Sequence, residues 1–486
     1  MNLKILSGAA LLLTAALASA QTQTNEVEAL KRQLQQMQEN FERVQKEQRE
    51  QIDALTKKLD ELTHQQQAEA EKKKLEQELA ADLQKNQPAT PGPAPVPQTA
   101  WSPSQPLTVA RAGPAYLNLS FDALMDVGGS TASDPSQFLE LGDHDPIKRG
   151  FSLRNAEIAM DGAVDPYLKG FANIVLKLDK NNETEIELEE TYLQTASLPA
   201  NLQLKGGQFF AAFGRQNSQH PHQWAFVDAP IILTRAFGPE GLRNLGAQIS
   251  WLLPTSFYTE ASLGILDGQG GTAFSFRNVG ENDGTGVDRF HGRATIDRHL
   301  SGPGDLLYVP RISSSFDLSD TQTLLVGASA AFGPNDTGGD RRTQIYGTDI
   351  YWKWKPANAH MGFPFVAWQT EALYQRFEAG EDIAAGLPAE TLEDWGFYTQ
   401  VLWGFHERWV AALRGEYADG NTGAFDPQDP FRGERTRISP NITFYPSEFS
   451  KIRLQYNYDH GELFGTDHSV WLQVEFLLGA HGAHKF

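Results

Sequence analysis

The chain has 486 residues, no cysteine and a formal net charge of −20 at pH 7. The lack of cysteine excludes disulfides, thiolate metal sites and cysteine nucleophiles. Most of the negative charge follows residue 100, where 47 Asp and Glu outnumber 29 Lys and Arg. Nucleic acid is therefore not an expected partner.

Residues 1–20 have the pattern of a secretory signal peptide. Lys4 precedes an apolar run, Ile5–Leu17, and the sequence Ala18-Ser19-Ala20 follows as a cleavage site. The run is too short to cross a bilayer as a helix, which needs roughly 20 apolar residues, and no other segment comes close to that length. We therefore expect an exported chain that is either soluble or a β-barrel.

Residues 25–86 are rich in Glu, Gln, Lys, Ala and Leu and contain neither Gly nor Pro. Apolar residues recur in steps of three and four, which is the seam of a coiled coil. They are Val27, Leu30, Leu34, Met37, Phe41 and Val44, and then Ile52, Leu55, Leu59 and Leu62. An isolated amphipathic stripe has nothing to pack against, so we favour a parallel oligomeric coiled coil over a single solvated or disordered segment.

Residues 87–114 are dominated by Pro, Ala, Ser and Thr, which predicts a semi-rigid linker. From Tyr116 the apolar period changes to two. Leu117, Leu119 and Phe121 alternate with polar residues, and Val470, Leu472, Val474 and Phe476 do the same near the end. About 16 such segments, separated alternately by short turns and long polar stretches, are typical of an outer-membrane barrel. We therefore predict an all-β, antiparallel transmembrane barrel over residues 115–486.

Several motifs resemble the opening hairpins of the phosphate-selective porin O/P family. They are Phe151-Ser-Leu-Arg-Asn-Ala156 with Gly162 and Asp165-Pro166, then Glu189-Glu-Thr-Tyr192, and then Gly207-Gln-Phe209 with Phe213-Gly214. The resemblance implies a 16-stranded, usually trimeric barrel with a long loop folded into the pore. Members named for phosphate rely on basic residues in the channel, whereas this barrel is acidic, so the ion preference stays open.

The segment after Gly214 is longer than an ordinary hairpin loop, and such loops are usually functional or disordered. In a barrel it would form a constriction or a plug-like insertion. Arg215, Arg235 and Arg243 could then offer positive charge to anions, or they could pair with carboxylates of the wall and stiffen the loop. We favour the pairing.

His220-Pro-His222, with Asp228 nearby, could bind a divalent metal, because imidazole and carboxylate both suit zinc. Two histidines two residues apart are a weak signal, so packing or hydrogen bonding of the rings is the favoured interpretation.

Asp179–Thr184 predicts a tight turn between two strands. Lys177 should then face an odd-numbered residue of the next strand, with Glu185, Glu187 and Glu189 as candidates. In a lumen these three would form an acidic ladder that favours cations. The alternative is a row of solvated or salt-bridged charges at the rim.

The favoured function is a porin-like channel for passive diffusion of small hydrophilic or ionic solutes. The chain would lie in outer-membrane lipid as a homo-oligomer, a trimer by preference, with the coiled coil in the periplasm. The alternative is a structural anchor whose coiled coil tethers the membrane to the cell wall. No catalytic motif is present in the sequence, so we expect neither enzymatic activity nor a cofactor.

Overall fold

The computed structural model describes residues 107–479, except 133, 136–138, 140, 197, 285, 426–428, 430–431 and 463. The expected signal peptide, the coiled coil and residues 87–106 of the linker lie outside the described residues. Among the described residues, no helix has the length and apolarity needed to cross a membrane.

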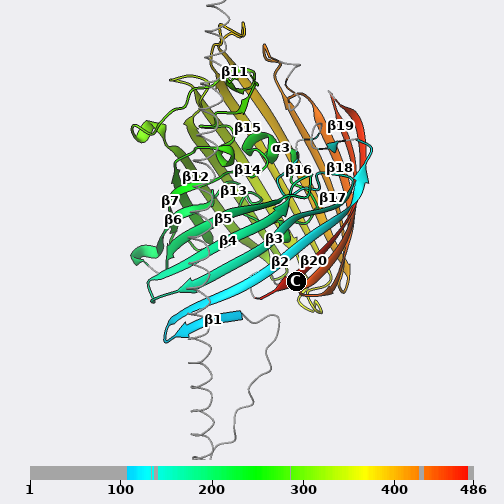
Figure 1. Ribbon diagram of the computed structural model, residues 1–486. Helices are drawn as coiled ribbons and strands as arrows, with labels where there is room; N and C mark the ends of the chain where they lie inside the picture. Colours follow the sequence, from blue (N-terminus) through cyan, green and yellow to red (C-terminus); the bar gives the residue numbers. More distant parts are fainter. Residues whose placement is uncertain are drawn as a thin grey trace, which may run out of the picture. The chain divides into compact units, whose positions relative to one another are not determined.

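Sixteen antiparallel strands form one closed barrel (Figure 1). Their bounds are β2 (Ala115–Ser130), β3 (Gly150–Ala163), β4 (Leu168–Leu178), β5 (Thr184–Thr195), β6 (Leu202–Phe210), β7 (Arg243–Leu252), β8 (Tyr258–Leu266), β12 (Leu307–Ser319), β13 (Gln322–Pro334), β14 (Arg342–Trp354), β15 (Phe365–Ala379), β16 (Glu390–His406), β17 (Trp409–Gly420), β18 (Arg435–Ser447), β19 (Ser450–Gly461) and β20 (Gly465–Leu478). Each strand pairs with the next, and β20 closes the ring by pairing with β2 from Phe121↔Leu478 to Ser130↔Ser469. The predicted 16-stranded barrel is confirmed.

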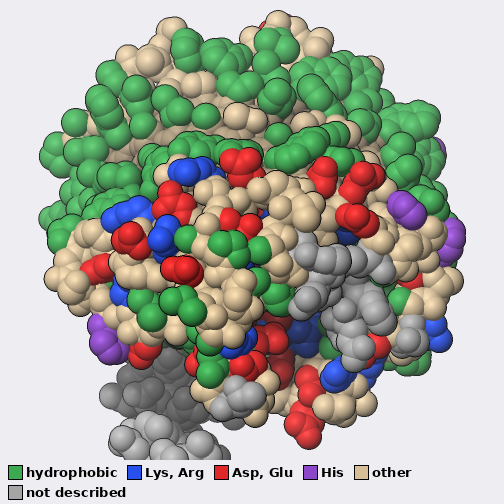
Figure 2. Space-filling view, turned by 90° about the horizontal axis from the view of Figure 1, so that it is seen from above, with side chains coloured by type: hydrophobic (Ala, Val, Ile, Leu, Met, Phe, Trp, Pro, Cys, Tyr) green, Lys and Arg blue, Asp and Glu red, His purple; other side chains and the backbone are tan. Residues whose placement is uncertain are grey.

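The two-residue period places opposite chemistry on the two faces of the wall, because successive side chains of a strand point to opposite sides. In β20, Val470 and Phe476 are 48% and 54% exposed on the outside, whereas Gln473 and Glu475 are 4% and 1% exposed on the inside. Figure 2 shows hydrophobic side chains over the outer wall in the upper part of the view and charged side chains across the loops in the lower part.

The longest connections between strands share one end of the barrel. Segments 131–149, 211–242, 267–306 and 421–434 lie at one end, whereas turns such as 320–321, 407–408 and 448–449 lie at the other. Three short strands, β9 (Glu281–Asn282), β10 (Asp288–Phe290) and β11 (Arg293–Ala294), form a small sheet within the segment 267–306.

The linker is shorter than expected. Residues Leu107–Ala112 form strand β1, which pairs with the start of β2. Gly113, at φ +62°, makes the turn between the two strands. The alternation in Leu107-Thr-Val-Ala-Arg-Ala112 is brief, and the surrounding Pro and Ala residues concealed it.

Candidate functional site

Residues 211–242, which we call the insert, fold back into the barrel (Figure 1). The insert contains α3 (Ile231–Phe237), the one α-helix among the described residues. Pro230 at the N-cap and Gly238 at the C-cap, with φ +75°, limit this helix to seven residues. All seven are buried. The helix packs on β15, β16 and β17.

One side of the insert is apolar and packs against the wall. Phe213 and Phe237 meet edge to face, with ring centroids 4.9 Å apart. They belong to a buried cluster with α3 and with wall residues that include Val309, Ile345, Leu373 and Tyr398. Apolar burial of this kind holds a loop in one place.

Ion pairs and hydrogen bonds of Asp228 hold the other side of the insert against the wall. Asp228 forms ion pairs with Arg414 and, at 3.5 Å, with Arg437. It also accepts hydrogen bonds from Gln455 and Asn457, at 3.0 and 2.6 Å. These partners lie on β17, β18 and β19, so the insert contacts the wall on both sides of the lumen.

The three arginines that we expected near a constriction lie apart. Arg215 stacks on the Tyr351 ring of β14, 4.0 Å from the centroid, and Arg235 donates to the Gly433 carbonyl at 2.9 Å. Arg243 forms ion pairs with Glu187 and, at 2.8 Å, with Glu240. For Arg243, the favoured interpretation of pairing with carboxylates agrees with the observed contacts.

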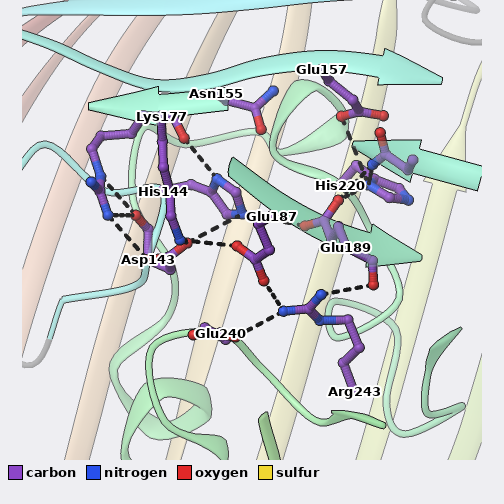
Figure 3. A network of polar contacts seen from close by, with 12 residues as sticks. Asp143, His144, Asn155, Glu157, Lys177, Glu187, Glu189, His220, Glu240 and Arg243 are labelled. Atoms are coloured by element: carbon purple, nitrogen blue, oxygen red, sulfur yellow. Dashed lines mark hydrogen bonds and ion pairs between the residues drawn. The ribbon is translucent and has the colours of Figure 1, made fainter. Parts of the chain in front are cut away.

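Four of the expected pore residues line one hollow of about 530 Å³, beside the N-terminal half of β5. Its polar lining is Asp143, Lys177, Glu185, Glu187, Gln208, Glu240, Arg243 and Thr272. Lys177 faces Glu185 in the strand register, as predicted, and forms ion pairs with Asp143 and, at 2.9 Å, with Glu187 (Figure 3). The chain of contacts therefore runs from Asp143 through Lys177 and Glu187 to Arg243.

The segment 131–149 supplies Asp143 to the lining of this hollow and His144 next to it. Burial would raise the pKa of Asp143, but His144, Lys177 and Arg154 outweigh it and lower that pKa. Burial would lower the pKa of His144, but Glu189 and Asp143 raise it to about 9. Both groups are therefore charged at neutral pH.

A β-bulge in β5 changes which of its glutamates point to the inside of the barrel. The register of β4 with β5 shifts between Asn173↔Glu190 and Ile174↔Leu188, so Glu189 is the extra residue. Glu189 and Glu190 are therefore both buried on the inner side, at 2% and 7% exposure. Sequence alternation identified Glu189 but not Glu190, because a bulge leaves no signal in the spacing.

His220 and His222 lie with carboxylates, but Asp228 is not among them. His220 Nδ1 is 2.9 Å from Glu189, and His222 Nδ1 is 3.3 Å from Glu157. Burial would lower the pKa of His220, whereas Glu157, Glu189 and Glu190 raise it well above its usual value. The sequence did not identify Glu157, because nothing in a single strand tells which loop will dock against it.

No protein-family model matches the chain. A protein of Aquifex aeolicus (strain VF5), described as an "uncharacterized protein", is 30% identical over 362 residues, which are 70% of this chain and 71% of the relative. The chain belongs to the family of this Aquifex protein.

Two solved structures are similar to this chain in fold. The outer membrane channel DcaP of Acinetobacter baumannii superposes with a TM-score of 0.51 at 11% identity, over 75% of this chain and 97% of DcaP. The anion-selective porin of Comamonas acidovorans gives a TM-score of 0.47 at 8% identity, over 75% and 100% of the two chains. The likeness to DcaP shows that this chain has the fold of that outer-membrane channel.

Proposed function

We propose that the protein is an outer-membrane channel through which small hydrophilic or ionic solutes diffuse passively. The observation that carries this proposal is the closed barrel of 16 strands with apolar side chains outside and charged side chains inside. Barrels of this size are too wide for their own wall side chains to fill. The outer membrane channel DcaP has the same fold.

The insert would set the size of the path, because it packs against walls on both sides of the lumen. The hollow beside β5 would then set the charge preference. Four carboxylates line it, from Asp143, Glu185, Glu187 and Glu240, against the two cations of Lys177 and Arg243. Since an excess of carboxylates favours cations, the preference we propose is cationic rather than the phosphate preference of the O/P family.

The trimeric assembly and the periplasmic position of residues 25–86 stay predictions. No contact among residues 107–479, as far as they are described, favours the tethering alternative, which depends on residues 25–86.

A planar-bilayer recording of the purified full-length protein tests the channel. We expect stepwise conductance increases when the protein inserts, because each barrel adds one water-filled path. A preparation that is folded, as judged by its altered migration before heating in gel electrophoresis, and yet gives no conductance would contradict the proposal.

A further inference from the structure

Five buried side chains meet where the insert touches the wall, and we call them the histidine-carboxylate cluster. They are Asp122 of β2, Glu157 of β3, Glu189 of β5, and His220 and His222 of the insert. Each is at most 5% exposed. The lining of the hollow beside β5 contains none of these five residues.

The backbone of the insert presents the two histidines on the same side. Pro221 begins a 3-10 turn, Pro221–Gln223, directly after His220. The turn brings the two imidazole rings into a stack, with centroids 5.7 Å apart and planes 11° from parallel. Lys451 of β19 fixes the turn from the wall by donating to the His222 carbonyl at 2.8 Å.

The ligand atoms converge in two overlapping triads. One is Asp122, Glu157 and His222, and the other is Glu157, Glu189 and His220, with the atoms of each triad within 4.8 Å of one another. His222 Nδ1 lies 3.3 Å from Glu157 Oε2 and 3.6 Å from Asp122 Oδ2. Ligands about 2.0 Å from a tetrahedral zinc ion are separated by roughly 3.3 Å, so these two distances of the first triad are close to the spacing that such an ion needs.

The side chains around the triads resemble the outer shell of a metal site. His220 directs Nδ1 toward Glu189 and Glu157, while its Nε2 lies 3.0 Å from Glu190. Metal-binding histidines commonly donate their second N–H to a carboxylate in this way. Asn173 donates to Glu189 at 2.6 Å, and Asn155 donates to Asp122 at 3.1 Å (Figure 3 shows Asn155 and the His220 side of the cluster).

The two asparagines supply an independent observation. Asn155 and Asn173 are 1% and 0% exposed, and the Oδ1 atom of each has no hydrogen-bond partner among the described residues. Buried polar atoms in native proteins are almost always satisfied by protein, water or an ion. Two such oxygens next to the same cluster favour a further polar group, such as an ion with its water, at this place.

We propose that the histidine-carboxylate cluster binds a divalent transition-metal ion, with zinc as the probe, and that the ion fastens the insert to β2, β3 and β5. The two imidazole ligands favour zinc and other late transition metals over magnesium and calcium. The ion would also offset the buried carboxylates, which are costly in a low-dielectric site unless they are compensated.

Metal analysis of the full-length protein tests this proposal. The protein is stripped with a chelator, incubated with zinc, desalted and analysed by mass spectrometry for zinc per chain. We expect zinc at or above a one-to-one ratio, retained in the presence of excess magnesium. Zinc at the level of the buffer would overturn the proposal, and protons on the histidines would then balance the carboxylates.

A cobalt titration of the unaltered protein makes the test independent of any variant. Bound cobalt should give visible absorption bands that zinc removes, because both ions compete for the same ligands. No change in the bands on adding zinc would contradict a shared site.

Two matched variants separate ligation from docking of the insert. Glu157→Gln removes the carboxylate that both triads share and should weaken zinc binding about tenfold or more. Glu371→Gln alters a buried wall carboxylate that accepts from the Arg215 and Gln216 N–H groups at 3.0 and 2.8 Å but belongs to neither triad. It should keep zinc. Equal losses in the two variants would contradict direct ligation.

Discussion

Arg243 closes a break in the barrel wall. In the described ladder, β5 pairs with β6 only from Thr191↔Gln208 to Gln194↔Lys205. Above this point the Arg243 guanidinium donates to the carbonyls of Leu188 and Glu189, at 3.1 and 2.7 Å. The Gln208 side chain donates to the same two carbonyls, at 2.5 and 3.2 Å. Two side chains therefore take the place of backbone hydrogen bonds at this point of the wall.

Replacement of Arg243 by methionine should destabilise the folded barrel by roughly 3 kcal/mol, because Glu187 and Glu240 lose their shared cation. The two strand carbonyls would keep only the Gln208 side chain as a donor. Urea titration of the protein in detergent, followed by tryptophan fluorescence, measures the change. Arg215→Met serves as the control. It loses only a stacking contact on Tyr351 and should cost about 1 kcal/mol. Equal midpoints for the two variants would contradict this role of Arg243.

The sequence predicts residue contacts well where a regular strand pair decides them. Lys177 faces Glu185 as the two-residue period requires. The contact of Glu157 with His222 was not predictable, because it depends on how a loop docks across the lumen. Glu190 was missed for a different reason, since the bulge at Glu189 breaks the period itself.

The insert is a separate element whose position depends on Asp228. Burial would raise the pKa of this carboxyl, but Arg437 and Arg414 outweigh burial and lower it from 3.8 to about 2. Because the folded pKa lies below the usual value, the stabilisation by Asp228 is complete above about pH 4 and is lost as the pH falls toward about 2.

Conductance should therefore rise between about pH 4 and pH 2 as the insert loosens. Recordings of single channels at stepped pH values measure this rise. The variant Asp228→Asn lacks the titrating group, so it should conduct more at neutral pH and show a flatter profile. Identical pH profiles for the two proteins would show that Asp228 does not hold the insert.

The length of the segment after Gly214 predicts a loop that inserts into the barrel. It does not reveal α3, because seven residues between Pro230 and Gly238 are too few for a helical period to be read. The helix packs on β15, β16 and β17, which begin more than 120 residues later in the chain. No local pattern encodes that contact.

The whole molecule follows from one pattern, the alternation of apolar and polar residues from Tyr116 onward. That pattern is repeated in strand after strand, so it predicts the barrel even though each segment is a weak signal. Strand number and ring closure agree with the prediction. The excess of 47 acidic over 29 basic residues after residue 100 is also a property of the whole chain.

The acidic hollow beside β5 should give the barrel channel its charge preference. The reversal potential in a potassium chloride gradient measures that preference, with Glu187→Gln as the variant that reduces the carboxylates of the hollow. We expect a potential of the sign for cation preference, and a shift toward zero in the variant. A potential of the opposite sign, with no change in Glu187→Gln, would contradict the account.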